Sequence, residues 1–353
     1  MQQLIDKEFP GENIKYQRIP CGKCIGCRLD YSKNWATRCV LEASQWEHNW
    51  FITLTYDEDH LPKWENGEYC DKNGLTWIDE TNEWQGYLKP EDMTLFLKRL
   101  RKYYKDHFDI PATIPDQLKD LPKEELPLEY QGIRFFYCGE YGGAPHPLYK
   151  DRVTGQITYS QGFRPHYHVI FFNLPIPLNE LQLDKESSKS GKQQFKCKFI
   201  EDIWGKGRIR ISEVNWQTCA YTARYITKKV TGEPAAAHYG RMGQTPEFVR
   251  MSRMPGIARQ YYELHKDEIY NLDEIVMKLT GEKSLAIKPP KYYDKLYDIE
   301  YPNRMAEIKD IRRTNAEEAA KVKASTTTLT QLKQLNIEED IKRDQLKKLK
   351  RDL

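Results

Sequence analysis

Residues 164–172, which read RPHYHVIFF, constrain the fold more than any other stretch of the chain. The stretch is rich in aromatic and β-branched residues, which is typical of a largely buried strand. Successive strand residues point to opposite faces, so His166 and His168 share one face while Tyr167 points to the other. Two explanations fit the histidine pair: ligands of a metal ion, or core histidines satisfied by hydrogen bonds. The strand by itself leaves both open.

Strand and helix patterns surround this stretch in the order of a mixed fold. Further strands are predicted at residues 50–56, 133–139 and 208–214. Apolar residues at helical spacing predict one helix that begins at Pro90 and another over residues 215–230. Most connections are short and antiparallel. The order therefore predicts an α+β fold, with an antiparallel sheet that carries helices on one face.

Turn signals and charge divide the chain into four segments. Residues 1–48 form a cysteine-rich segment, and residues 49–245 form the sheet domain, with a hairpin or loop insertion at 57–88. Residues 246–304 form a C-terminal extension that packs on this domain, with an extended arm in its proline-rich part. Residues 305–353 form a charged tail, helical or disordered.

Composition narrows the class of protein in three respects. The formal net charge of +3 is nearly balanced, so any basic surface that binds nucleic acid must be local. No apolar run is long enough to span a bilayer, and the N-terminus lacks a secretion signal, so we expect no membrane partner. Eight cysteines in 353 residues are too few for a disulfide scaffold. These features predict a reduced, cytosolic setting.

The predicted helix NWQTCAYTARYITKKV carries a second notable pair. Tyr221 and Tyr225 are four residues apart and share one helix face, and Lys228 and Lys229 follow them. A separate stripe is expected to face the sheet, namely Cys219, Ala223, Ile226 and Val230. The tyrosines are thus predicted to lie outside the core stripe. They are either an ordinary aromatic pair or a pair of nucleophiles.

A carboxylate lies at the end of another predicted strand. Glu140, in CGEYGG, precedes a glycine-rich turn. Placed next to the histidine pair, it would complete a three-ligand metal site with positions open for substrate and water. The alternative is an acidic turn residue in solvent, and spacing alone does not decide between the two.

The N-terminal segment contains a cysteine cluster. Cys21, Cys24 and Cys27 follow C-x2-C-x2-C spacing, and Cys39 comes twelve residues later. Four thiolates at these positions would close a tetrahedral structural zinc site. Iron–sulfur ligation and simple buried thiols are the alternatives.

Together, these motifs resemble the HUH endonuclease superfamily, and specifically the rolling-circle replication initiators of gokushovirus-type (Microviridae) single-stranded DNA phages. The resemblance covers most of the chain. It rests on the ordered motifs PCGKCIGCRLDYSKNWATRC, FITLTYDEDHLP, LFLKRLRK, GEYG, RPHYHVIFF, YITKKV, PGIARQYYELHKDEI and PPKYYDKLY. Tyr167 occupies the hydrophobe position of the family's His-hydrophobe-His strand. The resemblance implies an RRM-like antiparallel sheet.

The resemblance also implies roles for site residues. His166 and His168 become ligands of Mg²⁺ or Mn²⁺, with Glu140 as the third ligand. Tyr221 and Tyr225 become the nucleophiles, and Lys228 contacts phosphate or helps the phenol to ionise. The implied product is a 5′-phosphotyrosine and a free 3′-hydroxyl.

The implied partners are single-stranded DNA with the phage replication origin, and the host helicase and DNA polymerase, all in the host bacterial cytoplasm. Arg134, Arg164 and Lys229 are candidates to line the DNA groove, although each also fits an ordinary surface or core position. A plasmid initiator or transposase with the same site is one competing interpretation, and a noncatalytic DNA-binding protein is another. A zinc hydrolase is not supported by any third histidine or base motif.

Overall fold

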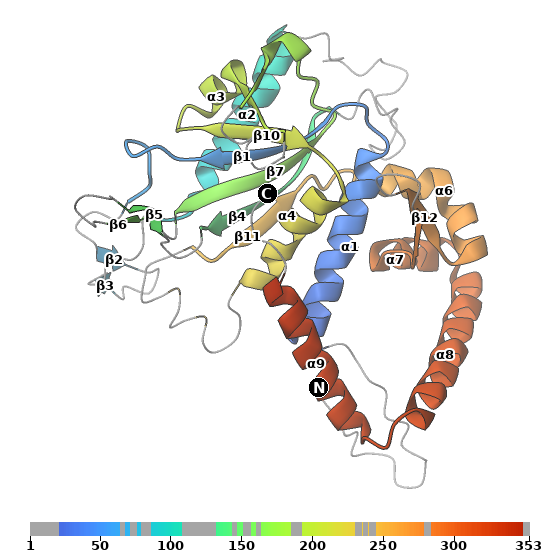
Figure 1. Ribbon diagram of the computed structural model, residues 1–353. Helices are drawn as coiled ribbons and strands as arrows, with labels where there is room; N and C mark the ends of the chain where they lie inside the picture. The colour runs from blue at the N-terminus through green and yellow to red at the C-terminus, as the bar shows by residue number, and fades with distance from the viewer. Residues whose placement is uncertain are drawn as a thin grey trace, which may run out of the picture.

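The centre of the protein is a seven-stranded sheet in which every neighbouring pair of strands is antiparallel (Figure 1). In sheet order the strands are β11 (Phe248–Met251), β4 (Arg134–Tyr141), β7 (Pro165–Phe172), β1 (Asn49–Thr55), β10 (Ile209–Glu213), β9 (Phe195–Cys197) and β8 (Leu181–Leu183). The computed structural model describes residues 21–63, 68–70, 76–78, 86–107, 132–142, 147–150, 157–159, 164–184, 193–229, 235, 239, 245–278 and 284–348. The four strands predicted from the sequence are confirmed as β1, β4, β7 and β10.

Helices and three small two-stranded sheets complete an α+β fold. The helices are α1 (Ile25–Ala43), α2 (Pro90–His107), α3 (Lys198–Trp204), α4 (Trp216–Lys228), α6 (Arg259–Leu272), α7 (Lys291–Glu300), α8 (Pro302–Ser325), α9 (Gln331–Lys348) and the short 3-10 helix η4 (Leu178–Glu180). The small sheets pair β2 (Glu68–Cys70) with β3 (Thr76–Ile78), β5 (Pro147–Lys150) with β6 (Ile157–Tyr159), and β12 (Ile275–Lys278) with β13 (Ser284–Ile287). Among the described helices, none combines the length and apolar composition needed to cross a bilayer.

The position of β7 between β1 and β4 explains why both of its faces are apolar. Tyr167, Val169 and Phe171 are fully buried in the cluster beneath α2 and α3. Ile170 and Phe172 are fully buried on the opposite face. A central strand with a helix layer on each side has no polar face. The histidines of β7 therefore lie at the end of a strand that is otherwise core on both sides.

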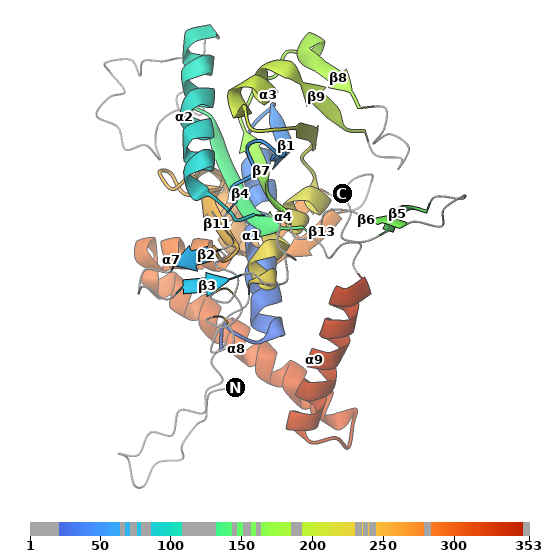
Figure 2. The same ribbon diagram turned by 90° about the vertical axis from the view of Figure 1, so that its left-hand side faces the viewer.

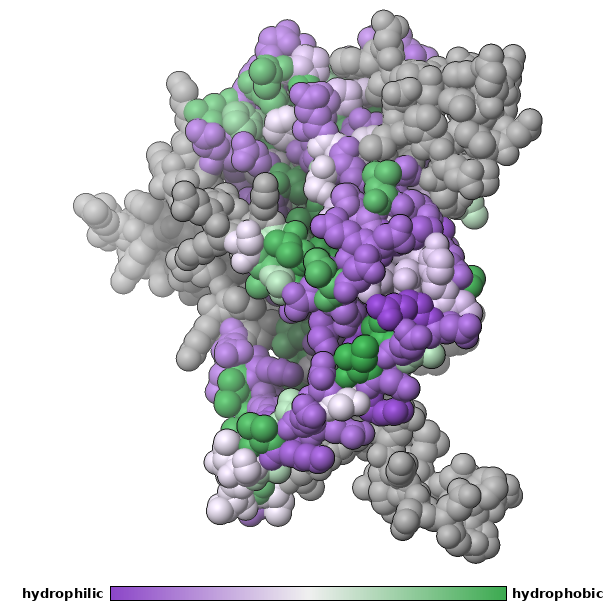
Figure 3. Space-filling view, turned by 90° about the vertical axis from the view of Figure 1, so that its right-hand side faces the viewer, coloured by the Kyte–Doolittle hydropathy of each residue, from purple (hydrophilic) through white to green (hydrophobic). Residues whose placement is uncertain are grey.

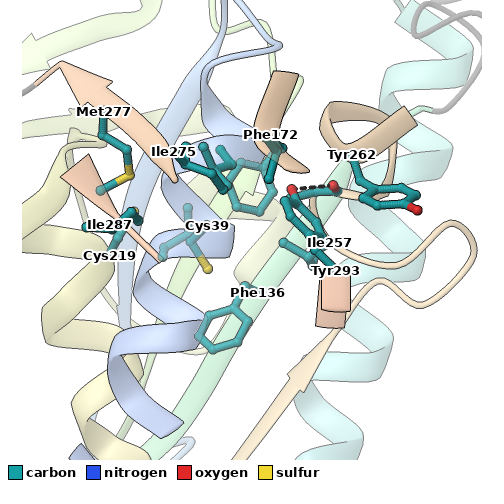
Figure 4. Close-up of a cluster of buried hydrophobic side chains, with 14 of the residues drawn as sticks. Cys39, Phe136, Phe172, Cys219, Ile257, Tyr262, Ile275, Met277, Ile287 and Tyr293 are labelled. Atoms are coloured by element: carbon teal, nitrogen blue, oxygen red, sulfur yellow. Dashed lines mark hydrogen bonds between the residues drawn. The ribbon is translucent and has the colours of Figure 1, made fainter. Parts of the chain in front are cut away.

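Helices cover both faces of this sheet, whereas the sequence predicted them on one face. α2 and α3 cover one face, and α4 and α1 lie side by side over the other (Figures 1 and 2). The difference arises because most of the cysteine-rich N-terminal segment that the structure describes is a helix. Ala36, Cys39 and Leu41 of α1 are buried. Figure 4 shows Cys39 in one cluster with Cys219 of α4 and Phe136 of β4.

The helix that begins at Pro90 is confirmed together with its predicted core stripe. Its buried apolar residues are Met93, Phe96, Leu97, Leu100 and Tyr104. The pairing of β2 with β3 agrees with a hairpin in the insertion at 57–88, while both predicted Asn-Gly turns include positions outside the described residues. The extended arm predicted in the proline-rich part of the C-terminal extension is wrong. That part contains α7, in which Tyr293 and Tyr297 are buried one helical turn apart.

The described part of the charged tail consists of the two helices α8 and α9. α8 leads away from the sheet, and α9 returns toward the start of α1 (Figure 1). The side of the molecule that carries α6, α7 and α8 is mostly hydrophilic, with separate hydrophobic patches (Figure 3). This agrees with the dense charge in the sequence of α8.

Candidate active site

Strands β4 and β7 bring the three predicted metal ligands together. Their antiparallel register places Glu140 directly opposite His166. Glu140 Oε1 lies 2.7 Å from His166 Nε2 and 3.0 Å from His168 Nε2. One ligand atom from each of the three side chains lies within 4.8 Å of the other two. Side chains 26 and 28 residues apart in the chain thus share one site.

Each histidine ring is oriented through its other nitrogen. His166 Nδ1 donates to the carbonyl oxygen of Arg164 at 2.9 Å, so its Nε2 is the nitrogen available as a ligand. His168 Nδ1 lies 3.0 Å from Thr53 Oγ1, and the rings of His168 and Phe51 stack at 5.5 Å between centroids. Such outer partners fix the ring and the tautomer of a metal-binding histidine.

The donor set of this site fits a divalent cation. Burial by itself raises the pKa of Glu140, but the two imidazoles outweigh it and hold the pKa well below its usual range. Glu140 is therefore anionic at neutral pH, although its side chain is almost wholly buried. One carboxylate oxygen and two imidazole nitrogens directed at a common point are an accepted ligand set for Mn²⁺, Fe²⁺ or Zn²⁺, and the carboxylate also suits Mg²⁺.

Helix α4 places both tyrosines against this histidine pair. The ring of Tyr225 stacks on His168 at 5.4 Å between centroids, and the ring of Tyr221 meets His168 edge-on at 5.1 Å. The two tyrosine rings lie 4.9 Å apart. A capping box between Asn215 and Thr218 fixes where the helix begins. Two aromatic hydroxyls and three metal-ligating groups therefore occupy one continuous cluster.

The prediction that the tyrosines lie outside the core is wrong. Tyr221 is 9% exposed and Tyr225 is 3% exposed, so both belong to the buried cluster under α4. Burial raises the pKa of both phenols, and the negative charge of Glu140 raises it further. In the protein alone, both are neutral hydroxyls. A nearby cationic charge would counteract this effect.

The three basic residues at the ends of α4 and β7 have different surroundings. Lys229 is exposed, and its carbonyl oxygen accepts a hydrogen bond of 2.7 Å from Arg28 Nη2. Arg164 forms an ion pair with Glu58 and donates to the carbonyl oxygen of Tyr56 at 2.8 Å. Lys228 is the last residue of α4, and its side chain lies outside the described part of the structure.

Arg134 does not fit its predicted role as a DNA contact. It is only 2% exposed and forms an ion pair with Glu42 of α1, which is equally buried. Arg134 Nη2 also donates to the carbonyl oxygens of Pro255 and Gly256, at 2.9 and 3.2 Å. A buried guanidinium requires such partners, so Arg134 joins α1, β4 and the segment before α6.

The cysteine cluster at the start of α1 has three members rather than four. Cys21, Cys24 and Cys27 form the group of possible ligands, with the Sγ atoms of Cys21 and Cys27 3.9 Å apart. Hydrogen bonds from backbone N–H groups lower the pKa of Cys21 to about 6, which favours the thiolate that binds metals. Cys39 is the correction, because three helical turns separate it from Cys27 and it is fully buried near Cys219.

Two residues next to the site were not predicted. Thr53 and Phe51 of β1 lie on the same face as the histidines, and the register places Thr53 directly opposite His168. The available signal was the alternation of FITLT, which puts these two side chains on one face of a strand. Knowing that face required the pairing of β1 with β7.

Comparisons with known proteins agree on one group. The model of a family of replication-associated proteins of the ORF2 type matches residues 155–230, which contain both the histidine strand and the tyrosine helix. The chain is 32% identical over 284 residues to the replication-associated protein ORF2 of Spiroplasma virus 4, covering 80% of this chain and 68% of that protein. It is 26% identical over 309 residues to the replication-associated protein VP4 of Bdellovibrio phage phiMH2K, covering 87% of this chain and 76% of that protein.

A third similar protein is the replication-associated protein ORF4 of Chlamydia phage 1. It is 25% identical over 215 residues, which cover 60% of this chain and 38% of that protein. No solved structure matches the chain significantly.

Proposed function

This chain belongs to the family of replication-associated proteins of Microviridae-type phages, and we propose that it is the nickase that starts rolling-circle replication. The observation that carries the proposal is the position of His168. Its imidazole lies 3.0 Å from Glu140 on one side and stacks on Tyr225 on the other. A nucleophile and a cation-binding group that touch the same side chain can act on one phosphate.

The proposed cleavage is a transesterification by a tyrosine. Glu140, His166 and His168 would hold the cation, which supplies Lewis-acid charge at the scissile phosphate when bound. The phenolic oxygen of Tyr221 or Tyr225 forms a bond to phosphorus, and the bond from phosphorus to the 3′ oxygen breaks. The phenol gives up its proton, and the departing 3′ oxygen gains one. The products are a 5′-phosphotyrosine and a free 3′-hydroxyl.

Two tyrosines allow the same site to finish the round. One tyrosine keeps the 5′ end of the displaced strand while the other cuts the regenerated origin. The new 3′-hydroxyl then attacks the first phosphotyrosine, which restores a phosphodiester and releases the phenol. The energy of the broken bond is kept in the phosphotyrosine, so rejoining needs no nucleotide cofactor.

The setting of this reaction follows from its products. The free 3′-hydroxyl is a primer for a host DNA polymerase, and continuous synthesis needs a host helicase ahead of it, so the protein would act in the host bacterial cytoplasm. Lys228, Lys229 and Arg164 are proposed to contact the DNA backbone beside the site. A noncatalytic DNA-binding protein would bind the same strand without forming a covalent bond.

End-labelled origin DNA tests the proposed reaction and its polarity. Purified protein is incubated with Mn²⁺ and overlapping single-stranded fragments that together cover both strands of its own phage genome. A label at the 3′ end should enter a denaturation-resistant protein band, because the tyrosine keeps the 5′ phosphate of the downstream piece. A label at the 5′ end should leave in a shorter free fragment. A mobility shift without any adduct on every fragment would reject the nickase.

The cysteine cluster is proposed to hold a structural zinc ion through Cys21, Cys24 and Cys27. Three thiolates at this spacing form a soft ligand set, which zinc favours and which leaves a fourth position for another ligand. The ion would fix the start of α1. Arg28, one residue after Cys27, is bonded to the end of α4, so this site supports the tyrosine helix from a distance.

Metal analysis tests this zinc site. Protein purified under reducing conditions should contain about one zinc per chain. Cys27→Ser should lose it, and Cys39→Ala should keep it, because Cys39 lies elsewhere on α1. Equal zinc content in wild type and Cys27→Ser would contradict the assignment, and loss of zinc in Cys39→Ala would restore the four-cysteine site.

A further inference from the structure

A pocket of about 480 Å³ lies between α1 and α7, outside the candidate active site. The side chains that give it its character are Tyr31, Trp35, Arg38, Lys291, Tyr292 and Lys295. Lys291 begins α7, and its backbone N–H donates to Asn34 Oδ1 of α1 at 3.2 Å. The pocket is therefore formed by two helices that are held to each other, and it combines aromatic rings with cations.

One wall of the pocket is a fixed aromatic stack. The guanidinium of Arg38 lies between the rings of Trp35 and Tyr292, 4.2 and 3.9 Å from their centroids. Two hydrogen bonds, of 3.1 and 2.8 Å, hold Arg38 to the carbonyl oxygen of Ile257. Because the guanidinium is stacked and hydrogen-bonded, this wall is ordered before any ligand arrives.

The outer edge of the pocket carries an exposed ring. Tyr31 is 52% exposed and meets Trp35 edge-on, 6.4 Å between centroids. Large aromatic side chains usually bury more of their surface than this. Tyr31 therefore offers a flat face to a ligand that enters between it and the α7 side of the pocket.

The charge of the pocket is mainly positive. Lys291 and Lys295 are exposed and one turn apart on α7, with Asp30 of α1 as the acidic member of the lining. An adjoining pocket of about 410 Å³ shares Asp30, Asn34 and Lys291 and adds Lys33 and Lys288. The other charged groups of that second pocket, Asp294 and Arg312, form an ion pair with each other. The two pockets together form a basic track along α1.

We infer that this track binds a segment of single-stranded DNA, with a base stacked on Tyr31 and phosphates near Lys291 and Lys295. Stacking rings next to a cationic path are the features with which proteins hold single strands without reading their sequence. The inference rests on the proposed function, because that function supplies the single strand. α1 has α4 on one side and α7 on the other, so the track would hold DNA on the far side of α1 from the tyrosines (Figure 1).

Binding of fluorescein-labelled oligothymidylate, followed by anisotropy in the presence of EDTA, tests the track without any cleavage. Tyr31→Ala should weaken binding about tenfold, while Tyr31→Phe, which keeps the ring, should bind like wild type. Lys291→Gln with Lys295→Gln should reduce the slope of log affinity against log salt by about two. The matched control, Lys321→Gln with Lys333→Gln, removes two exposed lysines from α8 and α9.

The inference is overturned if Tyr31→Ala binds like wild type, or if the α7 double variant has the salt slope of the control. Wild-type affinity in both variants, with tight binding of a protein to the same pocket instead, would assign the surface to a protein partner. Failure of the proposed function is a separate result. In that case wild type binds oligothymidylate and loses affinity in Tyr31→Ala, but no origin fragment forms a covalent adduct.

Discussion

Replacing His166 by alanine is expected to slow covalent adduct formation with origin DNA by about a hundred- to ten-thousandfold, because several kcal/mol of charge stabilisation depend on the cation site. His166 is the cleaner of the two histidines for this purpose. Its side chain is 16% exposed, whereas that of His168 is 7% exposed and packs against Tyr225 and Phe51. The rate is measured in single-turnover reactions with Mn²⁺.

A second variant and a control separate metal chemistry from folding. Glu140→Gln keeps the shape of the side chain but removes its charge, and it should lose a similar factor. His107→Ala is the control, since His107 is exposed on α2, on the other face of the sheet. All three variants should still bind oligothymidylate in EDTA. A wild-type rate in His166→Ala and Glu140→Gln would contradict the assigned ligands.

Replacing Glu42 by glutamine is expected to lower the free energy of unfolding by about 3–5 kcal/mol, because it leaves the guanidinium of Arg134 buried without its counter-charge. Glu42 is 2% exposed. Its carboxylate accepts from Arg134, from Trp46 Nε1 at 3.1 Å and from the backbone N–H of Ala258. It therefore joins the N-terminal helix, the central sheet and the segment before α6.

Urea unfolding followed by circular dichroism measures this effect. Adding Arg134→Met to Glu42→Gln should recover part of the lost stability, since the double variant no longer contains an unpaired charge. Arg304→Ala, which breaks an exposed pair with Glu307 on α8, should unfold at the urea concentration of wild type. Glu42→Gln with unchanged stability would show that the buried pair does not hold these three elements together.

The parts of the fold that sequence predicted are those set by local periodicity. Strand alternation placed His166 and His168 on one face, and helical spacing placed Tyr221 and Tyr225 one turn apart. Both statements depend only on residues close together in the chain. The position of Glu140 opposite His166 depends on the register of β4 with β7, which no local pattern determines.

The parts that sequence did not predict depend on what packs against each element. Tyr221 and Tyr225 are buried because α1 lies beside α4, and the segment that contains α1 was interpreted only by its cysteines. Arg134 begins a predicted strand near basic neighbours, but the buried Glu42 is 92 residues away in the chain. Cys39 has suitable chemistry for zinc, yet the helix between it and Cys27 separates the two thiols. In each case tertiary contacts decide the environment.

The most direct test of the proposed nickase is to identify the residue that carries the DNA. The Mn²⁺-dependent adduct is treated with nuclease and protease, and mass spectrometry locates the remaining nucleotide. The account predicts a 5′-phosphate ester on Tyr221 or Tyr225, and no adduct from the protein with both Tyr221→Phe and Tyr225→Phe, in which the buried rings are kept. A nucleotide on any other residue, or an intact adduct from the double variant, would contradict it.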